Sequence, residues 1–454
     1  MSMFHRKFIK TITTLLSVML VLTLAACGGS SGNSSSSDTP KPSEPASATT
    51  TPAASEAPKT EEPIELTFWT LGTNGYDELA KEYKKVKPNI TIKIQNTSDQ
   101  TAHHNNMLTA LSAGKGAPDI FMLEIAFLER FMEAKDSFVN LNDLGAKDLK
   151  GNYLDWKWSQ ASSDNGNYQF GLPTDVGPTV AYYRTDLLAQ AGMPTDPEGF
   201  YKTIDTWDKF DAVAKEFKAK TGKVFVDMPD LLYNSIRDQA NEIYYDKDDN
   251  FIGDTNPQVK KAWDYTVKAI QEGWVGNNSL WTPEWGQATN NGDFAVLLGP
   301  AWMSGVIKGN AKDASGKWMI TQMPEGPGNW GGSFISLPKE GKHPKEAFEF
   351  ISWLLNKDQQ LTSFKTNGLM PSIPALYDDP AFTGYIDDYY NKQAVAVEFG
   401  KAAKNVKQIH YGKLHDGTDS IFKDGLRNVL SKKSDPNKEW DDVIKKVKEL
   451  NKRS

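Results

Sequence analysis

Residues 64–97 carry the pattern that most constrains the fold of this chain. The stretch IELTFWTL at 64–71 alternates apolar and polar side chains, which is typical of a strand with one buried face. GYDELAKEYKKV at 75–86 then places apolar side chains at helical spacing, and NITIKIQ at 89–95 returns to period two. A strand, a helix and a second strand in this order predict a parallel sheet with helices on its faces, and therefore an α/β fold.

The alternation of strand and helix patterns continues along the chain. It recurs in PDIFML (118–123), DTWDKFDAVAKEFKAKTG (205–222), NPQVKKAWDYTVKAI (256–270), HPKEAFEFISWLL (343–355) and EWDDVIKKVKEL (439–450). Pro257 and Pro344 stand in the first turn of two predicted helices, where a missing N–H costs nothing, and Gly222 predicts the C-cap of another. About 390 residues follow residue 63, more than one core usually holds, so we expect two lobes.

The first 26 residues have the layout of a bacterial secretory signal. Three cations among the first ten residues precede an uncharged apolar run at 12–24, which is too short for an ordinary membrane span. The tetrapeptide LAAC at 24–27 resembles a lipobox and contains the only cysteine of the chain. This resemblance implies lipidation of Cys27 and cleavage just before it, so we expect residues 1–26 to be a signal peptide.

Residues 27–63 lack the apolar side chains that a packed core needs. Small and polar residues dominate this segment, and no aromatic residue follows Cys27 before Phe68, so we expect a flexible tether. A lipid on Cys27 predicts a protein anchored to the extracellular face of the cell membrane rather than spanning it. The formal charge of −7 becomes −10 once the three signal-peptide cations are removed, which argues against a nucleic-acid partner.

Six stretches of the chain, taken together, resemble the extracellular solute-binding proteins of family 1. They are FWTLGTNGYDELAKEYKKVKPNITIKI, LSAGKGAPDIFMLE, LPTDVGPTVAYYRTDLLAQAGMP, DTWDKFDAVAKEFKAKTG, GDFAVLLGPAWMSG and GGSFISLPKEGKHPKEAFEFISWLLNKDQQ. They occur in the family's order and cover nearly all of residues 64–375, whereas residues 376–454 offer only helical periodicity. Proteins of this family capture substrates, chiefly oligosaccharides, for ABC importers.

The resemblance implies a two-lobed fold of the periplasmic-binding-protein type (type II). In such a fold two α/β lobes are joined by chain crossings at a hinge, and the ligand lies in the cleft between them. The crossings fall near residues 172–183, 331–336 and 366–374. We therefore predict an N-terminal lobe of residues 64–176 plus 332–367 and a C-terminal lobe of residues 177–331 plus 368–454.

Thirteen tryptophans are a large supply for a protein that holds sugars, because sugar rings present flat C–H faces that suit aromatic side chains. Four of them lie on the apolar stripes of predicted helices and are expected in the core: Trp207, Trp263, Trp353 and Trp440. Trp281, Trp285, Trp302 and Trp330 lie instead in irregular stretches. Of these, Trp302 matches a family position that meets the sugar. We also predict Trp285 and Trp330 as ligand contacts, although such rings can equally cover a lobe surface.

The polar candidates follow predicted strands, where open α/β sheets place their ligands. Thr73 and Asn74 match family positions that contact sugar hydroxyls. Glu124 follows PDIFML directly and Asp175 lies in the first crossing. A carboxylate can accept hydrogen bonds from two hydroxyls at once, so we predict both as ligand contacts. The alternative is a surface carboxylate or a cap of the following helix.

Two stretches with residues typical of metal sites do not predict one. DKDDNFIGD at 246–254 resembles a calcium loop, but Phe251 replaces the required glycine, so we expect a hairpin turn. Adjacent His103 and His104 point about 100 degrees apart on a helix and cannot hold one metal from a single face. The sequence also has no nucleophile elbow, phosphate loop or dinucleotide fingerprint, so we expect no metal and no cofactor.

The sequence favours a monomeric binding protein that makes and breaks no bond. Its expected partners are an oligosaccharide or similar polar molecule and the permease subunits of an ABC importer, with membrane contact through the lipid alone. A polyamine binder, which would use carboxylates around aromatic walls, stays open as an alternative. A lipid-anchored glycosidase would need two opposed carboxyl groups at a fixed separation, for which the sequence has no signature. A purely adhesive lipoprotein would leave the cleft unexplained.

Overall fold

The computed structural model describes residues 62–453. The predicted signal peptide, the lipidated Cys27 and the tether up to residue 61 lie outside the described residues. Within 62–453, no helix combines the length and the apolar character that a membrane crossing requires.

The first sheet has five strands in the order β2-β1-β3-β12-β6. These are β1 (Ile64–Leu71), β2 (Ile90–Thr97), β3 (Ile120–Glu124), β6 (Leu172–Pro173) and β12 (Ser333–Ser336). Phe68 pairs in register with Ile94 on one side and with Ile120 on the other, and the three strands are parallel, as predicted. The sheet is mixed rather than parallel throughout, because β12 joins antiparallel to both β3 and β6 after a long excursion of the chain.

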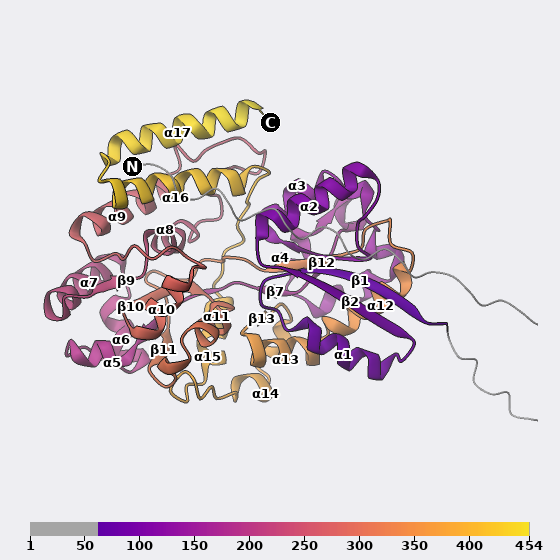
Figure 1. Cartoon of the computed structure of the whole chain (residues 1–454), viewed down its shortest axis with the longest axis horizontal. Coiled ribbons are helices and arrows are strands. Elements are labelled where there is room, and N and C mark those ends of the chain that lie inside the picture. Colours follow the sequence, from indigo (N-terminus) through magenta and orange to yellow (C-terminus); the bar gives the residue numbers. More distant parts are fainter. Residues whose placement is uncertain (1–61, 454) are drawn as a thin grey trace, which may run out of the picture. The chain divides into compact units, whose positions relative to one another are not determined.

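Helices cover this sheet and form the first lobe with it (Figure 1). They are α1 (Tyr76–Val86), α2 (Gln100–Ala113), α3 (Leu128–Met132), α4 (Asp155–Gln160) and α12 (Pro344–Leu354). In α1 the buried residues are Tyr76, Leu79, Ala80 and Tyr83, at the helical spacing of the predicted stripe. The short η1 (Ile125–Phe127) follows β3 without a break.

The second sheet has four strands in the order β11-β8-β10-β9 and is the centre of the second lobe. These are β8 (Thr179–Arg184), β9 (Val224–Val226), β10 (Phe294–Pro300) and β11 (Trp318–Thr321). Every residue of β8 and β10 is buried, as expected for strands covered on both faces. Only β9 and β10 are parallel, since β8 runs antiparallel to both of its neighbours.

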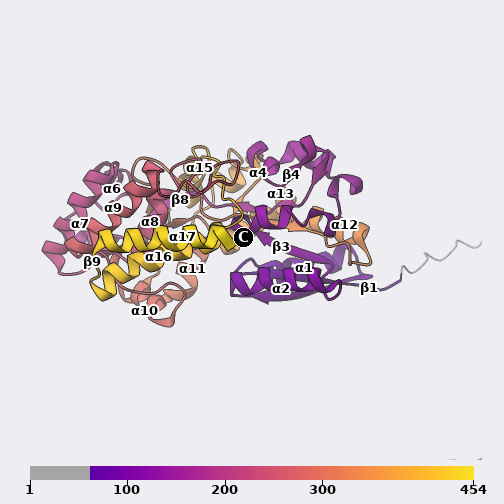
Figure 2. The same cartoon turned by 90° about the horizontal axis from the view of Figure 1, so that it is seen from above.

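Further helices belong to the second lobe. They are α5 (Thr185–Gln190), α6 (Pro197–Ile204), α7 (Trp207–Thr221), α8 (Pro229–Arg237), α9 (Pro257–Glu272), α10 (Pro283–Asn291), α11 (Met303–Asn310), α15 (Val395–Ala403), α16 (His415–Lys432) and α17 (Pro436–Arg453). Helix α7 ends on Gly222 at φ 74°, and Pro257 opens α9, so both predicted signals are confirmed. Helices α16 and α17 run side by side in both views (Figure 1, Figure 2).

The chain passes between the two sheets at three places. In the first passage the chain leaves β6, forms β7 (Asp175–Val176) and enters β8. In the second it returns through residues 329–332 to β12. In the third it forms β13 (Met370–Pro371) after α13 (Lys357–Asn367), and β13 pairs with β7. The first two passages touch, because the Trp330 N–H donates to the Gly177 carbonyl at 2.8 Å. A Cβ on Gly177 would lie 1.9 Å from the Trp330 carbonyl oxygen, so this close approach requires glycine.

The stretch DKDDNFIGD forms a turn, as predicted. Tyr245 and Phe251 form an antiparallel bridge, and Asp246 accepts hydrogen bonds from the Asp248 and Asn250 N–H groups, both at 2.9 Å. Asp249 takes the positive φ of 60° that the tight turn needs.

Candidate functional site

Four tryptophans from separate elements meet in the second lobe and at its crossing. We call Trp281, Trp285, Trp302 and Trp330 the indole cluster. The Trp281 ring stacks on Trp302 with centroids 6.1 Å apart and meets Trp285 edge-on at 5.7 Å. Trp302 in turn meets Trp330 at 5.2 Å. The cluster joins the loop before α10, α10 itself, the start of α11 and the return crossing into one aromatic surface.

Trp281 is the open ring of this cluster. It is 57% exposed, which is unusual for so large an apolar side chain. Its φ of 67° lies in the left-handed region, which costs a bulky residue free energy. Strain of this kind concentrates at functional sites. The residues predicted as ligand contacts omit Trp281, and the only signal for it is its place in the irregular stretch NNSLWTPE.

Trp285 does not offer a ring face, so this prediction is wrong. Its side chain is fully buried, and its Nε1 donates to the Asp227 carboxylate at 2.8 Å. The reason is local: Thr282 caps α10 by accepting from the Trp285 N–H at 3.2 Å, and the helix that follows turns this indole inward. Trp285 is therefore a buried residue that packs edge-on against the exposed Trp281 ring.

Burial also raises the pKa of Asp227, the acid that accepts the hydrogen bond of Trp285. Asp227 has no exposed surface, and burial raises its pKa from 3.8 to about 7, against the lowering effect of the hydrogen bond from Trp285. The second carboxylate oxygen, Oδ1, has no hydrogen-bond partner among the described residues. Asp227 therefore keeps its proton well above the pH at which an exposed aspartate loses it.

Trp302 and Trp330 are half-buried and lie together at the crossing. The Trp302 Nε1 donates to the Trp330 carbonyl at 3.2 Å. A Cβ on Gly331 would lie 2.8 Å from that nitrogen, and Gly331 has a φ of 88°. The ammonium of Lys423, on α16, lies 5.9 Å from the Trp330 ring centroid. Contact of either indole with a ligand stays a prediction.

Glu124 and Asp175 lie at the ends of β3 and β7, and both are buried. Glu124 Oε2 accepts from the Ala126 N–H at 2.7 Å and from Gln100 Nε2 at 2.9 Å. Asp175 Oδ1 accepts from the Ser333 N–H at 3.0 Å and from the Thr174 hydroxyl at 2.5 Å. Glu124 is thus the cap of η1, which is the alternative that the sequence left open.

The charge of Lys157 interacts with both of these acids. No sequence pattern predicted this lysine as part of the site. It lies on α4 with no exposed surface, and its Nζ has no hydrogen-bond partner among the described residues. The ammonium stands 3.8 Å from the centroid of Phe334. We call Lys157, Glu124 and Asp175 the charge triad. Its members are drawn together from three segments 18 to 51 residues apart in the chain.

In the charge triad, burial shifts the pKa of each group toward its neutral form, and the opposite charges oppose that shift. Burial lowers the pKa of Lys157 from 10.5 to about 7, although the charges of Asp175 and Glu124 oppose that shift. Burial raises the pKa of Glu124 from 4.5 to about 7, and Asp416 at the start of α16 adds to the rise. The pKa of Asp175 is raised by burial too, against the hydrogen bond from Thr174 and the charge of Lys157. Each group of the triad therefore depends on the others for its charge.

His104 holds the backbone of Glu124 through a hydrogen bond. The Glu124 N–H donates to His104 Nε2 at 3.1 Å, while His104 Nδ1 lies 2.7 Å from the Gln100 carbonyl. His103 turns the other way, with its Nε2 2.7 Å from the Met122 carbonyl. Burial lowers the pKa of His104 to about 3, so its ring is neutral and free to accept that hydrogen bond.

Thr73 and Asn74 lie in the loop between β1 and α1. Thr73 is exposed, and Asn74 is buried with both polar atoms engaged: its Nδ2 donates to the Leu71 carbonyl at 3.0 Å, and its Oδ1 accepts from the Tyr76 N–H at 2.9 Å. Asn74 shapes the loop between β1 and α1. Among residues 62–453, no hydrogen bond joins either residue to the charge triad or to the indole cluster, and their predicted ligand contacts stay predictions.

Two α/β lobes joined by three chain passages, with aromatic and charged groups gathered at the passages, define a two-lobed binding protein. Residues 78–389 match a family described as bacterial extracellular solute-binding protein, and this chain belongs to that family. The predicted family and fold class are confirmed.

Named relatives cover most of the chain. It is 26% identical to the arabinooligosaccharide-binding protein of Halalkalibacterium halodurans, over 72% of this chain and 75% of that protein. It is 27% identical to the lactose-binding protein of Rhizobium radiobacter, over 77% of this chain and 84% of that protein.

Solved structures share the fold. The crystal structure of an extracellular solute-binding protein of family 1 is 32% identical, with a TM-score of 0.76, covering 85% of this chain and 99% of that one. The ABC transporter associated binding protein from B. animalis subsp. lactis, in complex with β-1,6-galactobiose, has a TM-score of 0.74 at 21% identity, covering 86% of this chain and 98% of that one.

Proposed function

We propose that this protein captures an oligosaccharide outside the cell and delivers it, chemically unaltered, to the permease subunits of an ABC importer. The observation that carries the proposal is the indole cluster, with the exposed and strained Trp281 stacked on Trp302 beside a chain crossing. Membership of the solute-binding family, and relatives named for binding arabinooligosaccharides and lactose, support the same guest class.

The chemistry of the guest fits both groups of residues. A sugar ring packs its C–H face on an indole and pairs its hydroxyls with short polar groups. Glu124 and Asp175 can accept from hydroxyls as carboxylates, and charge-assisted bonds are about twice as strong as neutral ones. A micromolar dissociation constant needs about 8 kcal/mol, which two stacked rings and a few paired hydroxyls can supply.

Closure of the lobes over the guest explains delivery. The lobes touch through short passages, and a guest held by both of them favours the closed arrangement over the open one. The permease then recognises the closed, loaded protein. We propose that the protein acts as a monomer, attached to the cell membrane by a lipid on Cys27, which raises its concentration near the transporter.

The guest is tested with the mature chain and a panel of arabinooligosaccharides, lactose, β-1,6-galactobiose and spermidine. Tryptophan fluorescence and melting temperature report binding, and chromatography of the mixture reports turnover. Stabilisation by a sugar that is recovered intact is the expected result. Release of smaller sugars would establish a glycosidase instead, and stabilisation by spermidine alone would establish a polyamine binder.

Attachment is tested separately. Replacing Cys27 by serine removes the acceptor of the lipid, so the variant is expected in the soluble fraction while the parent protein sediments with membranes. Equal sedimentation of both would contradict the anchor.

A further inference from the structure

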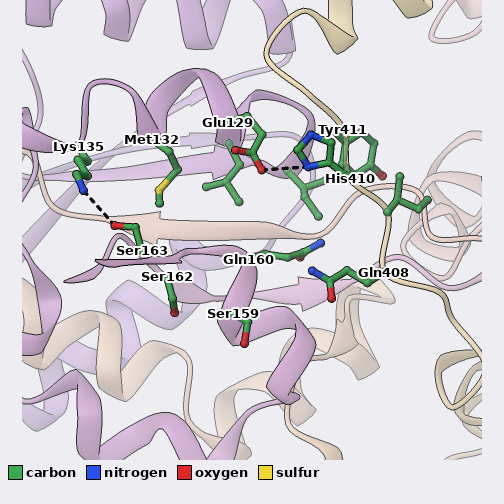
Figure 3. Close-up of a pocket in the computed structure, with 13 residues that line it drawn as sticks. Glu129, Met132, Lys135, Ser159, Gln160, Ser162, Ser163, Gln408, His410 and Tyr411 are labelled. Atoms are coloured by element: carbon green, nitrogen blue, oxygen red, sulfur yellow. Dashed lines mark hydrogen bonds and ion pairs between the residues drawn. The ribbon is translucent and has the colours of Figure 1, made fainter. Parts of the chain in front are cut away.

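A cavity of about 420 Å³ is lined by residues of both lobes and by no residue of the indole cluster (Figure 3). Helices α3 and α4 and strand β4 (Ser162–Ser163) line it from the first lobe, and residues 408–411 line it from the second. The second-lobe segment is held in place, because the His410 N–H donates to the Asn241 carbonyl at 3.0 Å. The volume falls within the range of about 300–1,000 Å³ that small-molecule sites occupy.

Two glutamine amides reach this cavity without partners. Gln160 is the last residue of α4, and its Oε1 is buried with no hydrogen-bond partner among the described residues. Gln408, from the other lobe, is exposed and makes no hydrogen bond among residues 62–453, so its amide is free to bind a guest. Figure 3 shows both amides directed into the same part of the cavity. A buried carbonyl oxygen without a donor is uncommon in folded proteins and points to a group that binds there.

The charged side chains of the walls are already paired. Lys135 meets Asp164 at 2.8 Å. His410 lies 3.8 Å from Glu129 on one ring nitrogen and 3.4 Å from Asp249 on the other. What remains for recognition is therefore neutral: amides, hydroxyls such as that of Ser159, and the apolar surfaces of Leu128 and Met132.

We propose that this cavity is a second binding site, for a neutral sugar of one or two rings. Amides donate to and accept from hydroxyls at once, and the apolar side chains suit the C–H face of a ring. The proposal rests on the proposed function for the class of guest but not for the site. Because both lobes line the cavity, a guest there biases their relative position, and its binding is coupled reciprocally to binding at the indole cluster.

The test is a calorimetric titration of the mature chain with glucose and with the oligosaccharide that binds most tightly. We expect glucose to bind in a weak event, separate from the tight event. Gln160→Leu should weaken the glucose event at least tenfold and leave the tight event within twofold. Trp302→Ala should do the reverse. Gln359→Leu is the matched control, because Gln359 Oε1 is also buried without a partner but lies on α13, outside the cavity.

The outcomes separate the two proposals. A tight event with no glucose event, or a glucose event that Gln160→Leu leaves unchanged, overturns the second site alone. Equal weakening by Gln160→Leu and Gln359→Leu also overturns it, since the effect would not come from the cavity. The absence of both events with every sugar overturns the proposed function as well. The melting temperature of each variant confirms that it is folded.

Discussion

Replacing Lys157 with methionine is expected to stabilise the protein while weakening its grip on the guest. Methionine is unbranched and only one heavy atom shorter than lysine, and it removes the buried charge. The fall of the Lys157 pKa from 10.5 to about 7 corresponds to about 5 kcal/mol of unfavourable free energy at neutral pH, because the unfolded chain holds that proton more readily than the folded one.

Part of this stabilisation is offset by the effect of the substitution on Glu124 and Asp175. Without the cation, the pKa values of Glu124 and Asp175, already raised by burial, rise further, so both carboxyls shift toward the neutral form at pH 7. Allowing about 2 kcal/mol for that change leaves a net stabilisation of about 3 kcal/mol, within the range seen when buried charges give way to apolar side chains. For a protein of this size it should raise the melting temperature by about 4 °C.

The pH dependence has a definite sign. With the folded pKa of Lys157 below its unfolded value, stability rises with pH between about 7 and 10.5 in the parent protein. Glu124 has the opposite effect on stability, and at lower pH. Because its pKa is raised in the folded protein, stability falls as pH rises from 4.5 to about 7. Lys157→Met should remove the rise of stability above pH 7. The fall below pH 7 should persist and extend to higher pH, because the pKa of Glu124 rises further without the cation.

Calorimetry and sugar titration between pH 6 and 10 check both effects. We expect affinity to fall about tenfold at pH 7, because neutral carboxyls form weaker hydrogen bonds than carboxylates. Lys150→Met, at an exposed lysine earlier in the same segment of the chain, should change neither property. A melting temperature that falls, or an unchanged affinity together with an unchanged slope above pH 7, would refute the reasoning.

Three further substitutions test other parts of the site. Trp281→Ala should leave the melting temperature within about 1 °C, since the ring is 57% exposed, and weaken sugar binding about tenfold in a fluorescence titration; equal affinity would remove Trp281 from the site. Asp227→Asn keeps an acceptor for Trp285 and removes an acid whose pKa is about 7, so stability should cease to fall between pH 4 and 7, and a persisting slope in thermal melts would contradict this. Gly177→Ala forces a Cβ against the Trp330 carbonyl and should cost about 1–3 kcal/mol in calorimetry while weakening sugar binding; an unaffected protein would show that the crossings can move apart freely.

Local signals in the sequence predicted the elements well. The stripe of α1, the glycine that ends α7 and the proline that opens α9 depend on a few neighbouring residues, and the structure has all three where they were expected. The parallel order of β2, β1 and β3 also followed from local alternation. The antiparallel strand β12 did not, because its partner β3 lies about two hundred residues earlier in the chain.

Site residues were harder to predict because their roles depend on burial. Trp285 and Trp281 lie four residues apart in one irregular stretch, yet one is fully buried and the other is open to solvent. A single cap at Thr282 separates them by starting a helix between them. Composition and spacing carry no information about which ring turns inward.

The sequence by itself determined the α/β class, the two lobes and the supply of indoles and carboxylates, because periodicity, caps and composition are local properties. Only the tertiary structure decided that the charge of Lys157 acts on both Glu124 and Asp175, and that four indoles from three segments meet. Charge and exposure depend on which distant segments exclude water from a side chain, and that is settled when the chain packs.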